Sequence, residues 1–445
     1  MISKLIFIMA HEMGDLRFYS TYKSLMRNQW RPYEELKNEQ EKQLRHMINF
    51  VYHNIPYYHK LLDSLHLRPD DIRKKEDLQK LPIITKEVIN KNWDDFKPLC
   101  LSKIKYYQRS TGGSTGTPFK YRLEKFDRFL GGALMYRGWG YAGYGLGDRM
   151  VFFGGSSLRI TTGSSLSRFS HEISRNIRML SSFDMDEENL IKYVHTINKF
   201  RPKFMYGYAS SFYFFAKWLE QNGLEVHAPK AIFTTAEKLF PNMRKKIEDA
   251  FRTEVYDAYG LNDGGVSACE CSEHLGLHID MERAIMEVVD ENGDQIESGQ
   301  GRIIATSLHN HAMPFIRYDT GDIGHVILDI CGCGRQYKLL KEVVGRQQEI
   351  LSTPDGKHIH GEFFTHIFWE IDGVKEFQVI QRNSDRLIIR IVPDENFDKK
   401  QLEVIKEIIR KRSELWQIDF EFPDKIERTR AGKYKFVIKE ISGGD

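Results

Sequence analysis

The strongest constraint on the fold is an alternation of short apolar runs and helical patterns between Phe126 and Phe251. The runs RMVFFGG, KFMYGYAS and KAIFTTAE have strand character and end in small residues. Helical segments such as FYFFAKWLEQNG and NMRKKIEDAF lie between and after them. This order is typical of an α/β domain whose functional residues lie where the strands end. The sequence therefore predicts a large multi-layer α/β domain.

The rest of the chain suggests a second, smaller domain. At 445 residues the chain is too long for one ordinary core. Residues 33–67 have helical spacing broken at Pro56, residues 104–123 predict a strand, a loop and a strand, and residues 254–340 are mostly strand and turn. After Gly345 two strands, an amphipathic helix and a strand follow, which suits an α+β lobe of about 100 residues. The predicted domains are residues 1–345 and a mobile lobe at 346–445.

Composition narrows the classes of partner. Lysine and arginine total 65 against 62 acidic residues, and a net charge of +3 is too small to indicate nucleic acid or an anionic membrane as the main partner. The apolar run LIFIMA at residues 5–10 is too short for a membrane span and no signal cleavage site follows it, so it is predicted to be a buried strand or helix. Five cysteines do not make a secreted disulfide framework, and a cytoplasmic location is expected.

The segment RSTGGSTGTPFKY, residues 109–121, combines glycines and hydroxyls, which bind phosphate oxygens through bare N–H groups and side chains. The P-loop NTPase pattern is excluded because Thr117 follows Gly116 where lysine is required, and Pro118 and a strand follow where a helix should begin. The flanking strands argue against a linker. Taken alone, the loop fits a phosphate-binding hairpin and an ordinary glycine-rich turn equally well.

Five segments, in order, resemble the core motifs of the adenylate-forming (acyl-CoA synthetase) superfamily. They are closest to the branch that holds phenylacetate–CoA ligase and the CapK-type proteins of capsular polysaccharide biosynthesis. The five are STGGSTGTP, AYGLND at 258–263, MPFIRYDTGDIG at 313–324, VVGRQQEIL at 343–351 and ERTRAGKYK at 427–435. The resemblance implies an enzyme that uses ATP to convert a carboxylic acid to an acyl adenylate.

The same resemblance assigns roles to residues. Lys433 would stabilise charge in the adenylation step, and Asp263 would hold Mg²⁺. Tyr259 would stack on adenine, Asp322 would bind the ribose hydroxyls, and Arg346 would reach the ribose or phosphate. The remaining expected ATP-binding residues are Thr111, Gly112, Gly113, Ser114, Thr115, Gly116, Thr117, Glu237, Gly260 and Asn262. Without the resemblance, Asp322 would be interpreted as an ordinary turn residue, and Lys433 as a lysine exposed to solvent.

Two motifs depart from the family pattern. Asn262 and Asp263 stand where the family has Ser or Thr followed by Glu, so the carboxylate is one methylene shorter and a water would bridge to magnesium. Residues 347–349, Gln-Gln-Glu, differ from the family's G-R-x-D-D segment, and the hinge between the domains is expected at 346–349. Neither change removes a required function.

The expected acid pocket draws on Tyr206, Tyr208 and Ser210, next to the TTAE strand that ends at Glu237. The expected acceptor is coenzyme A, as in the phenylacetate ligases. The alternatives are an amine or sugar acceptor, as in CapK-type relatives, and a nucleotide-binding pseudoenzyme. The acid and the oligomeric state do not follow from the sequence.

The cysteines indicate a metal site. CEC at 269–271, His278 and CGC at 331–333 supply soft thiolates and an imidazole, which suit tetrahedral zinc. The alternative is scattered free thiols, since the C-x-C spacing is tighter than that of common zinc fingers. The predicted structural zinc ligands are Cys271, His278, Cys331 and Cys333, with Cys269 in reserve.

Overall fold

The computed structural model describes residues 2–110, 119–154, 165–182, 185–346, 350–355, 358–360, 362–369, 371–429 and 434–440. The chain divides into two compact units. The described residues up to Val344 form the first unit, and those from Gly345 onward form the second.

The first unit is built on a mixed sheet, to which the described residues contribute eleven strands in the order β10-β11-β12-β13-β9-β8-β7-β6-β5-β3-β4. Five neighbouring strands are parallel: β3 (Met150–Gly154), β4 (Ile177–Ser181), β5 (Phe204–Tyr208), β6 (Ala231–Thr235) and β7 (Glu254–Gly260). The antiparallel part contains β8 (Ser267–Glu270), β9 (Leu277–Ile279), β10 (Ala284–Val289), β11 (Gly299–Ser307), β12 (Tyr318–Ile327) and β13 (Leu339–Arg346).

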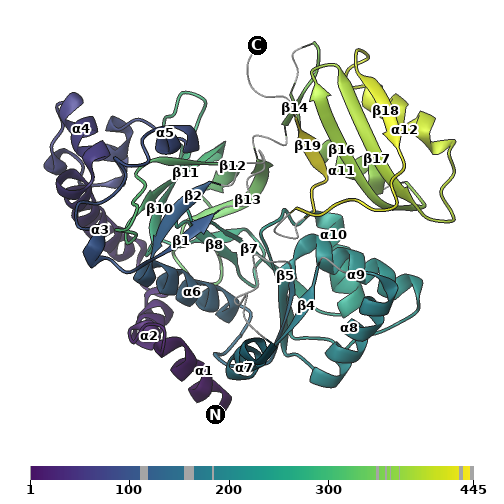
Figure 1. Cartoon of the computed structure of the whole chain (residues 1–445), viewed down its shortest axis with the longest axis horizontal. Coiled ribbons are helices and arrows are strands. Elements are labelled where there is room, and N and C mark those ends of the chain that lie inside the picture. The colour runs from purple at the N-terminus through teal and green to yellow at the C-terminus, as the bar shows by residue number, and fades with distance from the viewer. Residues whose placement is uncertain are drawn as a thin grey trace. The chain divides into compact units, whose positions relative to one another are not determined.

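Helices cover both faces of the parallel strands, which explains their continuous apolar runs. On β3, Phe152 packs against Trp139 of α6 (Lys125–Gly140), while the next residue, Phe153, packs against Phe212 and Phe215 of α9 (Ala209–Gln221). Successive side chains therefore enter opposite layers. The other helices of these layers are α1 (Ile2–Glu12), α2 (Phe18–Asn28), α7 (Ser165–Arg175), α8 (Glu187–Phe200) and α10 (Pro241–Phe251) (Figure 1).

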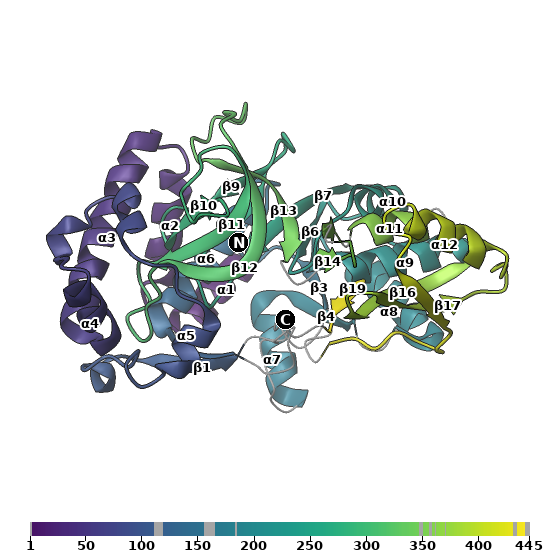
Figure 2. The same ribbon diagram turned by 90° about the horizontal axis from the view of Figure 1, so that it is seen from above.

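A helical cluster packs against the antiparallel strands (Figures 1 and 2). It comprises α3 (Tyr33–Asn54), α4 (Pro56–Ser64), α5 (Lys86–Lys91) and the 3₁₀ turns η1 (Pro69–Asp71), η2 (Lys75–Lys80) and η3 (Leu101–Lys103). Pro56 begins α4 rather than interrupting a helix, because its missing N–H costs nothing in a first turn. The strands β1 (Tyr106–Ser110) and β2 (Lys120–Glu124) form an antiparallel hairpin in the same unit.

The second unit has a sheet of four described strands in the order β18-β17-β16-β19. Its core joins side chains of both helices to the sheet, including Phe364 and Ile405. The elements are β14 (Ile350–Ser352), β15 (His358–His360), α11 (Glu362–Trp369), β16 (Val374–Asn383), β17 (Arg386–Pro393), α12 (Gln401–Arg410), β18 (Gln417–Glu421) and β19 (Val437–Lys439).

The prediction of a mixed α/β fold is confirmed, but the prediction that residues 5–10 are buried is wrong. The run forms part of α1, in which Phe7 is buried while Leu5, Ile6 and Met9 are exposed. A short apolar run does not tell which of its faces meets the core. Within the described residues, no helix is long and apolar enough to cross a membrane.

Candidate active site and metal site

The carboxyl ends of three parallel strands bring the predicted site segments together. Tyr208 at the end of β5 is in register with Thr235 at the end of β6, which is in register with Ala258 near the end of β7. Such an edge is where α/β sheets bind ligands. Gly260 ends β7, and exposed Asn262 and buried Asp263 lie in the turn that leads to β8.

Tyr259 is held against Asp322. The Tyr259 hydroxyl donates to Oδ2 of Asp322 at 2.9 Å, and the Asp322 backbone N–H donates to Oγ1 of Thr320 at 3.1 Å. Burial, followed by the charge of Asp322, raises the pKa of Tyr259 well above its usual value, so the phenol stays protonated as a donor. The carboxylate on β12 is thus oriented by a residue of β7.

Asp263 is paired with a tyrosine that the sequence reasoning passed over. The hydroxyl of fully buried Tyr318 donates to Oδ2 of Asp263 at 2.8 Å. Burial raises the pKa of Tyr318, and the Asp263 charge raises it further. Tyr318 lies within the MPFIRYDTGDIG segment, four residues before Asp322, so the motif itself was the signal that marked it.

The hairpin strand β2 returns beside this pair. The Phe119 ring stacks on Tyr318 with centroids 6.1 Å apart, and the charge of Asp263 contributes to the raised pKa of Tyr121, after burial. The first residues after the glycine-rich loop are therefore anchored next to Asp263. The predicted loop residues Thr111–Thr117 themselves lie outside the described residues.

Glu237 follows β6, and its carboxylate lies at the start of α9. Its Oε2 accepts a hydrogen bond of 3.0 Å from the backbone N–H of Ser210, in the first turn of the helix, where a carboxylate is favoured by the helix dipole. The two predicted pocket tyrosines are buried: Tyr208 completely, and Tyr206 in the core with its ring 4.8 Å from that of Trp139. The structure thus joins Ser210 to Glu237 and directs Tyr206 into the α6 layer.

One further predicted residue is located only in part, and another is not among the described residues. Arg346 is the last residue of β13, and its side chain lies outside the described part of the chain. Lys433 and residues 347–349 also lie outside it.

Four predicted metal ligands converge. Cys271 follows β8, His278 is on β9, and Cys331 and Cys333 lie between β12 and β13. Their ligand atoms all lie within 4.8 Å of one another. The Sγ atoms of Cys271 and Cys331 are 3.5 Å apart, and Nε2 of His278 is 3.3 Å from Sγ of Cys271 and 3.4 Å from Sγ of Cys333.

These distances fit one tetrahedral metal. Zinc bonds of about 2.3 Å to sulfur and about 2.0 Å to nitrogen place neighbouring ligand atoms ~3.5–3.8 Å apart. A separation of 3.5 Å between the sulfurs of Cys271 and Cys331 is far too long for a disulfide. Three thiols and one imidazole leave no open position, as in a structural site.

Cys269 is placed elsewhere. A Cβ added to Gly138 of α6 would lie 2.3 Å from the Cys269 sulfur, so this thiol packs directly beneath the helix. Burial raises the pKa of Cys269 well above its usual value. Cys269 lies outside the group of four ligand atoms and fills the core beside Tyr141.

A polar network below the site was also not anticipated. Thr234 donates to Oδ1 of Asp257 at 2.7 Å, and the Asp257 backbone N–H donates to Glu270, which Arg244 binds through two hydrogen bonds. Burial raises the pKa of Asp257 to about 6. These residues are far apart in sequence and only the fold brings them together.

Comparisons with known proteins agree with these features. Residues 351–440 match the family model of the CapK C-terminal domain. Protein CapK of Staphylococcus aureus is 26% identical over 430 residues, covering 92% of each chain, and phenylacetate–coenzyme A ligase of Thermus thermophilus is 27% identical over 332 residues, covering 72% of each. The crystal structure of 2-hydroxyisobutyryl-CoA ligase in the postadenylation state shares the fold, with a TM-score of 0.74, 18% identity and coverage of 93% and 91%.

Proposed function

We propose that this chain, which belongs to the adenylate-forming superfamily alongside CapK and the phenylacetate–CoA ligases, uses ATP to activate a carboxylic acid as its acyl adenylate. The observation that carries the proposal is the pair of buried carboxylates, Asp263 and Asp322, each held by a tyrosine hydroxyl beside the carboxyl ends of the strands. Two oriented carboxylates suit a ribose diol and a cation that accompanies phosphates.

The reaction divides into two transfers. In the first, an oxygen of the acid attacks the α-phosphorus of ATP, the new O–P bond forms, and the bond to pyrophosphate breaks. In the second, the acceptor attacks the acyl carbon and AMP leaves. Activation is needed because a carboxylate repels nucleophiles and its own leaving group is oxide.

Different residues would bind the ribose, the phosphates and the acid. Asp322, oriented by Tyr259, would accept from both ribose hydroxyls and fix the α-phosphate relative to the acid. Lys433 would place positive charge where the phosphoryl oxygens gain negative charge, and the loop Thr111–Thr117 would hold the terminal phosphates. Arg346, Gly260 and Asn262 would complete the nucleotide site, and Ser210 and Glu237 would border the acid.

Two metals fit the residues present. Magnesium would be held by Asp263 and the ATP phosphates, with waters completing its shell, and would neutralise phosphate charge. Zinc would be held by Cys271, His278, Cys331 and Cys333, where it would tie the β8–β9 turn to the loop before β13. The zinc would be structural, because four protein ligands complete its shell.

The acceptor has two candidates. Coenzyme A is the acceptor that the names of the ligase relatives imply. An amine or sugar acceptor is the alternative expected for CapK-type proteins. It is supported by the sequence match to CapK, which covers 92% of the chain against 72% for the phenylacetate–CoA ligase, and by the match of the C-terminal residues to the CapK domain.

The test uses the purified protein with Mg-ATP and a panel of carboxylic acids, and product analysis by mass spectrometry. Without an acceptor, an acyl adenylate should form with at least one acid. Adding coenzyme A or a panel of amino sugars should then release AMP and yield either the thioester or the amide. ATP binding without any acyl adenylate would instead support the pseudoenzyme alternative.

A further inference from the structure

The amino edge of the parallel sheet carries a row of like charges. Arg149, Lys203 and Lys230 are the residues directly before β3, β5 and β6, which are neighbouring strands whose first residues pair across the sheet. Backbone hydrogen bonds fix the row itself. The Lys203 N–H donates to the Arg149 carbonyl at 2.9 Å, and the Lys230 N–H donates to the Lys203 carbonyl at 2.7 Å. Three cations therefore begin adjacent strands, about 4.8 Å apart.

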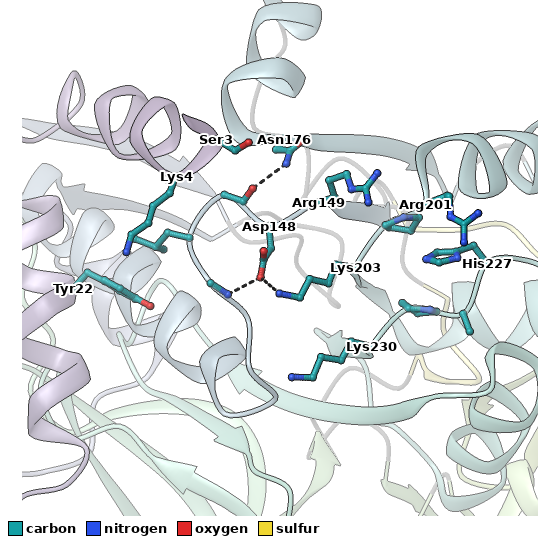
Figure 3. Close-up of a pocket in the computed structure, with 16 residues that line it drawn as sticks. Ser3, Lys4, Tyr22, Asp148, Arg149, Asn176, Arg201, Lys203, His227 and Lys230 are labelled. Atoms are coloured by element: carbon teal, nitrogen blue, oxygen red, sulfur yellow. Dashed lines mark hydrogen bonds and ion pairs between the residues drawn. The ribbon is translucent and has the colours of Figure 1, made fainter. Parts of the chain in front are cut away.

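This row borders a cavity of about 1010 Å³, at the opposite edge of the sheet from the candidate active site. All three cations of the row line the cavity, together with Lys4 of α1 and Arg201 at the end of α8. Figure 3 shows Lys4 on one side of the cavity, Arg201 beside His227 on the other, and Lys203 and Lys230 between them. Five basic side chains from separate segments therefore line one cavity.

The charge of the cavity is unbalanced. The single lining carboxylate belongs to Asp148, which pairs with Lys203 at 2.8 Å and accepts a hydrogen bond from the Gly145 N–H at 2.9 Å. No carboxylate of the described residues lies within ion-pair distance of the other four cations. Arg149 donates to the carbonyl of Phe200 at 3.1 Å, which uses one of its five N–H donors. The cavity thus has an excess of positive charge.

Local structure does not account for this excess. Arg201 ends α8, where the helix dipole favours a cation, but Lys4 lies in the first turn of α1, where the dipole disfavours one. Like charges on neighbouring strands repel each other, so the row costs stability that a bound anion would recover. Burial, and then the charges of Arg201 and Arg149, lower the pKa of the lining His227, so the positive charge acts inside the cavity.

We propose that this cavity binds a small molecule that carries two or more phosphate groups. A lone carboxylate would neutralise one of the cations, whereas several phosphates bring negative oxygens to ammonium and guanidinium groups at once. The volume and the concave lining suit a small molecule. Because the cavity and the candidate active site lie at opposite edges of the sheet, the proposal does not depend on the enzymatic reaction.

The experiment measures binding of inositol hexaphosphate to the full chain by titration calorimetry, with saturating AMP present to fill the nucleotide site. The wild type should bind one equivalent, more weakly as salt is added. Lys4→Gln/Lys230→Gln should weaken binding about fivefold for each cation removed. Asp148→Asn should tighten binding about fivefold, because it removes the single lining carboxylate and keeps an oxygen to accept from Gly145.

A matched variant separates the cavity from the charge of the whole protein. Lys42→Gln/Lys399→Gln removes the same charge from exposed positions, one in each unit, that do not line the cavity. It should bind the probe as the wild type does. Circular dichroism melts should show that all variants are folded.

Four results would overturn the proposal. One is absence of binding to the wild type at low salt, and another is binding that saturating AMP abolishes, which would place the probe in the nucleotide site. The third is equal weakening in Lys4→Gln/Lys230→Gln and Lys42→Gln/Lys399→Gln. The fourth is binding of citrate as tight as that of inositol hexaphosphate, which would contradict the preference for phosphate.

Discussion

The Tyr259 hydroxyl donates a 2.9 Å hydrogen bond to Oδ2 of Asp322 and so connects β7 to β12, two strands that are not neighbours in the sheet. In the proposed reaction the carboxylate of Asp322 fixes the ribose of ATP. The tyrosine is therefore a positioning residue: it acts on the nucleotide through Asp322.

Tyr259→Phe removes this hydrogen bond and keeps the ring. A hydrogen bond to a charged group contributes about 1.5–3 kcal/mol, so the KM for ATP should rise about tenfold or more, with a smaller change in kcat. Tyr256→Phe is the matched control, since it removes a tyrosine–carboxylate bond on the same strand, to Glu254. Equal ATP KM values in the two variants would contradict the role given to Tyr259.

Lys433→Ala should lower adenylation strongly while ATP still binds. Loss of one group that stabilises transition-state charge costs about 10²–10³ in rate. Single-turnover formation of the acyl adenylate measures the step, and calorimetry measures ATP binding. Lys425→Ala, at an exposed lysine of the same unit, should leave both unchanged. Adenylation at the wild-type rate in Lys433→Ala would contradict the role given to Lys433.

The purified protein should contain one equivalent of zinc by elemental analysis. Cys331→Ser should lose most of the metal, whereas Cys269→Ser should keep it, because Cys269 packs beneath Gly138. Removing the metal with a chelator should lower the melting temperature, since the site joins two distant segments. Zinc loss in Cys269→Ser with retention in Cys331→Ser would contradict the ligand set.

Acid should destabilise the first unit through His11. Burial lowers the pKa of His11 from 6.5 to about 3, so the unfolded chain takes up the proton first. The contribution to the free energy of unfolding is constant above pH 6.5 and falls as pH drops toward 3, by about 1.4 kcal/mol per pH unit. His171, with a pKa lowered to about 4 by burial, adds in the same direction.

Urea unfolding at several pH values measures this slope. His11→Gln should flatten it by about one proton, whatever the variant does to absolute stability. An unchanged slope would contradict this account, because it would mean that the pKa of His11 is the same in the folded and the unfolded chain.

Local patterns were sufficient for the fold class and the family resemblance, both of which are confirmed. The runs at β3, β5 and β6 are apolar on both faces because helices cover both, and that pattern is visible in the sequence. The pairing of Tyr318 with Asp263 is not visible in the sequence, although Tyr318 lies within a motif, because the two residues are 55 positions apart and only the fold brings them together.

The sequence also did not predict where the cationic side chains gather or which face of α1 is exposed. A net charge of +3 conceals the gathering of Lys4, Arg149, Arg201, Lys203 and Lys230, which come from separate segments around one cavity. Likewise, the apolar run of α1 predicted a buried element, yet only its Phe7 face meets the core, and Leu5, Ile6 and Met9 are exposed.

The most direct test of the central claim is exchange of labelled pyrophosphate into ATP, with the wild-type protein, Mg-ATP and a panel of carboxylic acids, without acceptor. Reversible adenylation predicts exchange that depends on at least one acid and is lost in Asp322→Ala. No exchange with any acid, from protein that still binds ATP, would contradict the claim that this chain forms acyl adenylates.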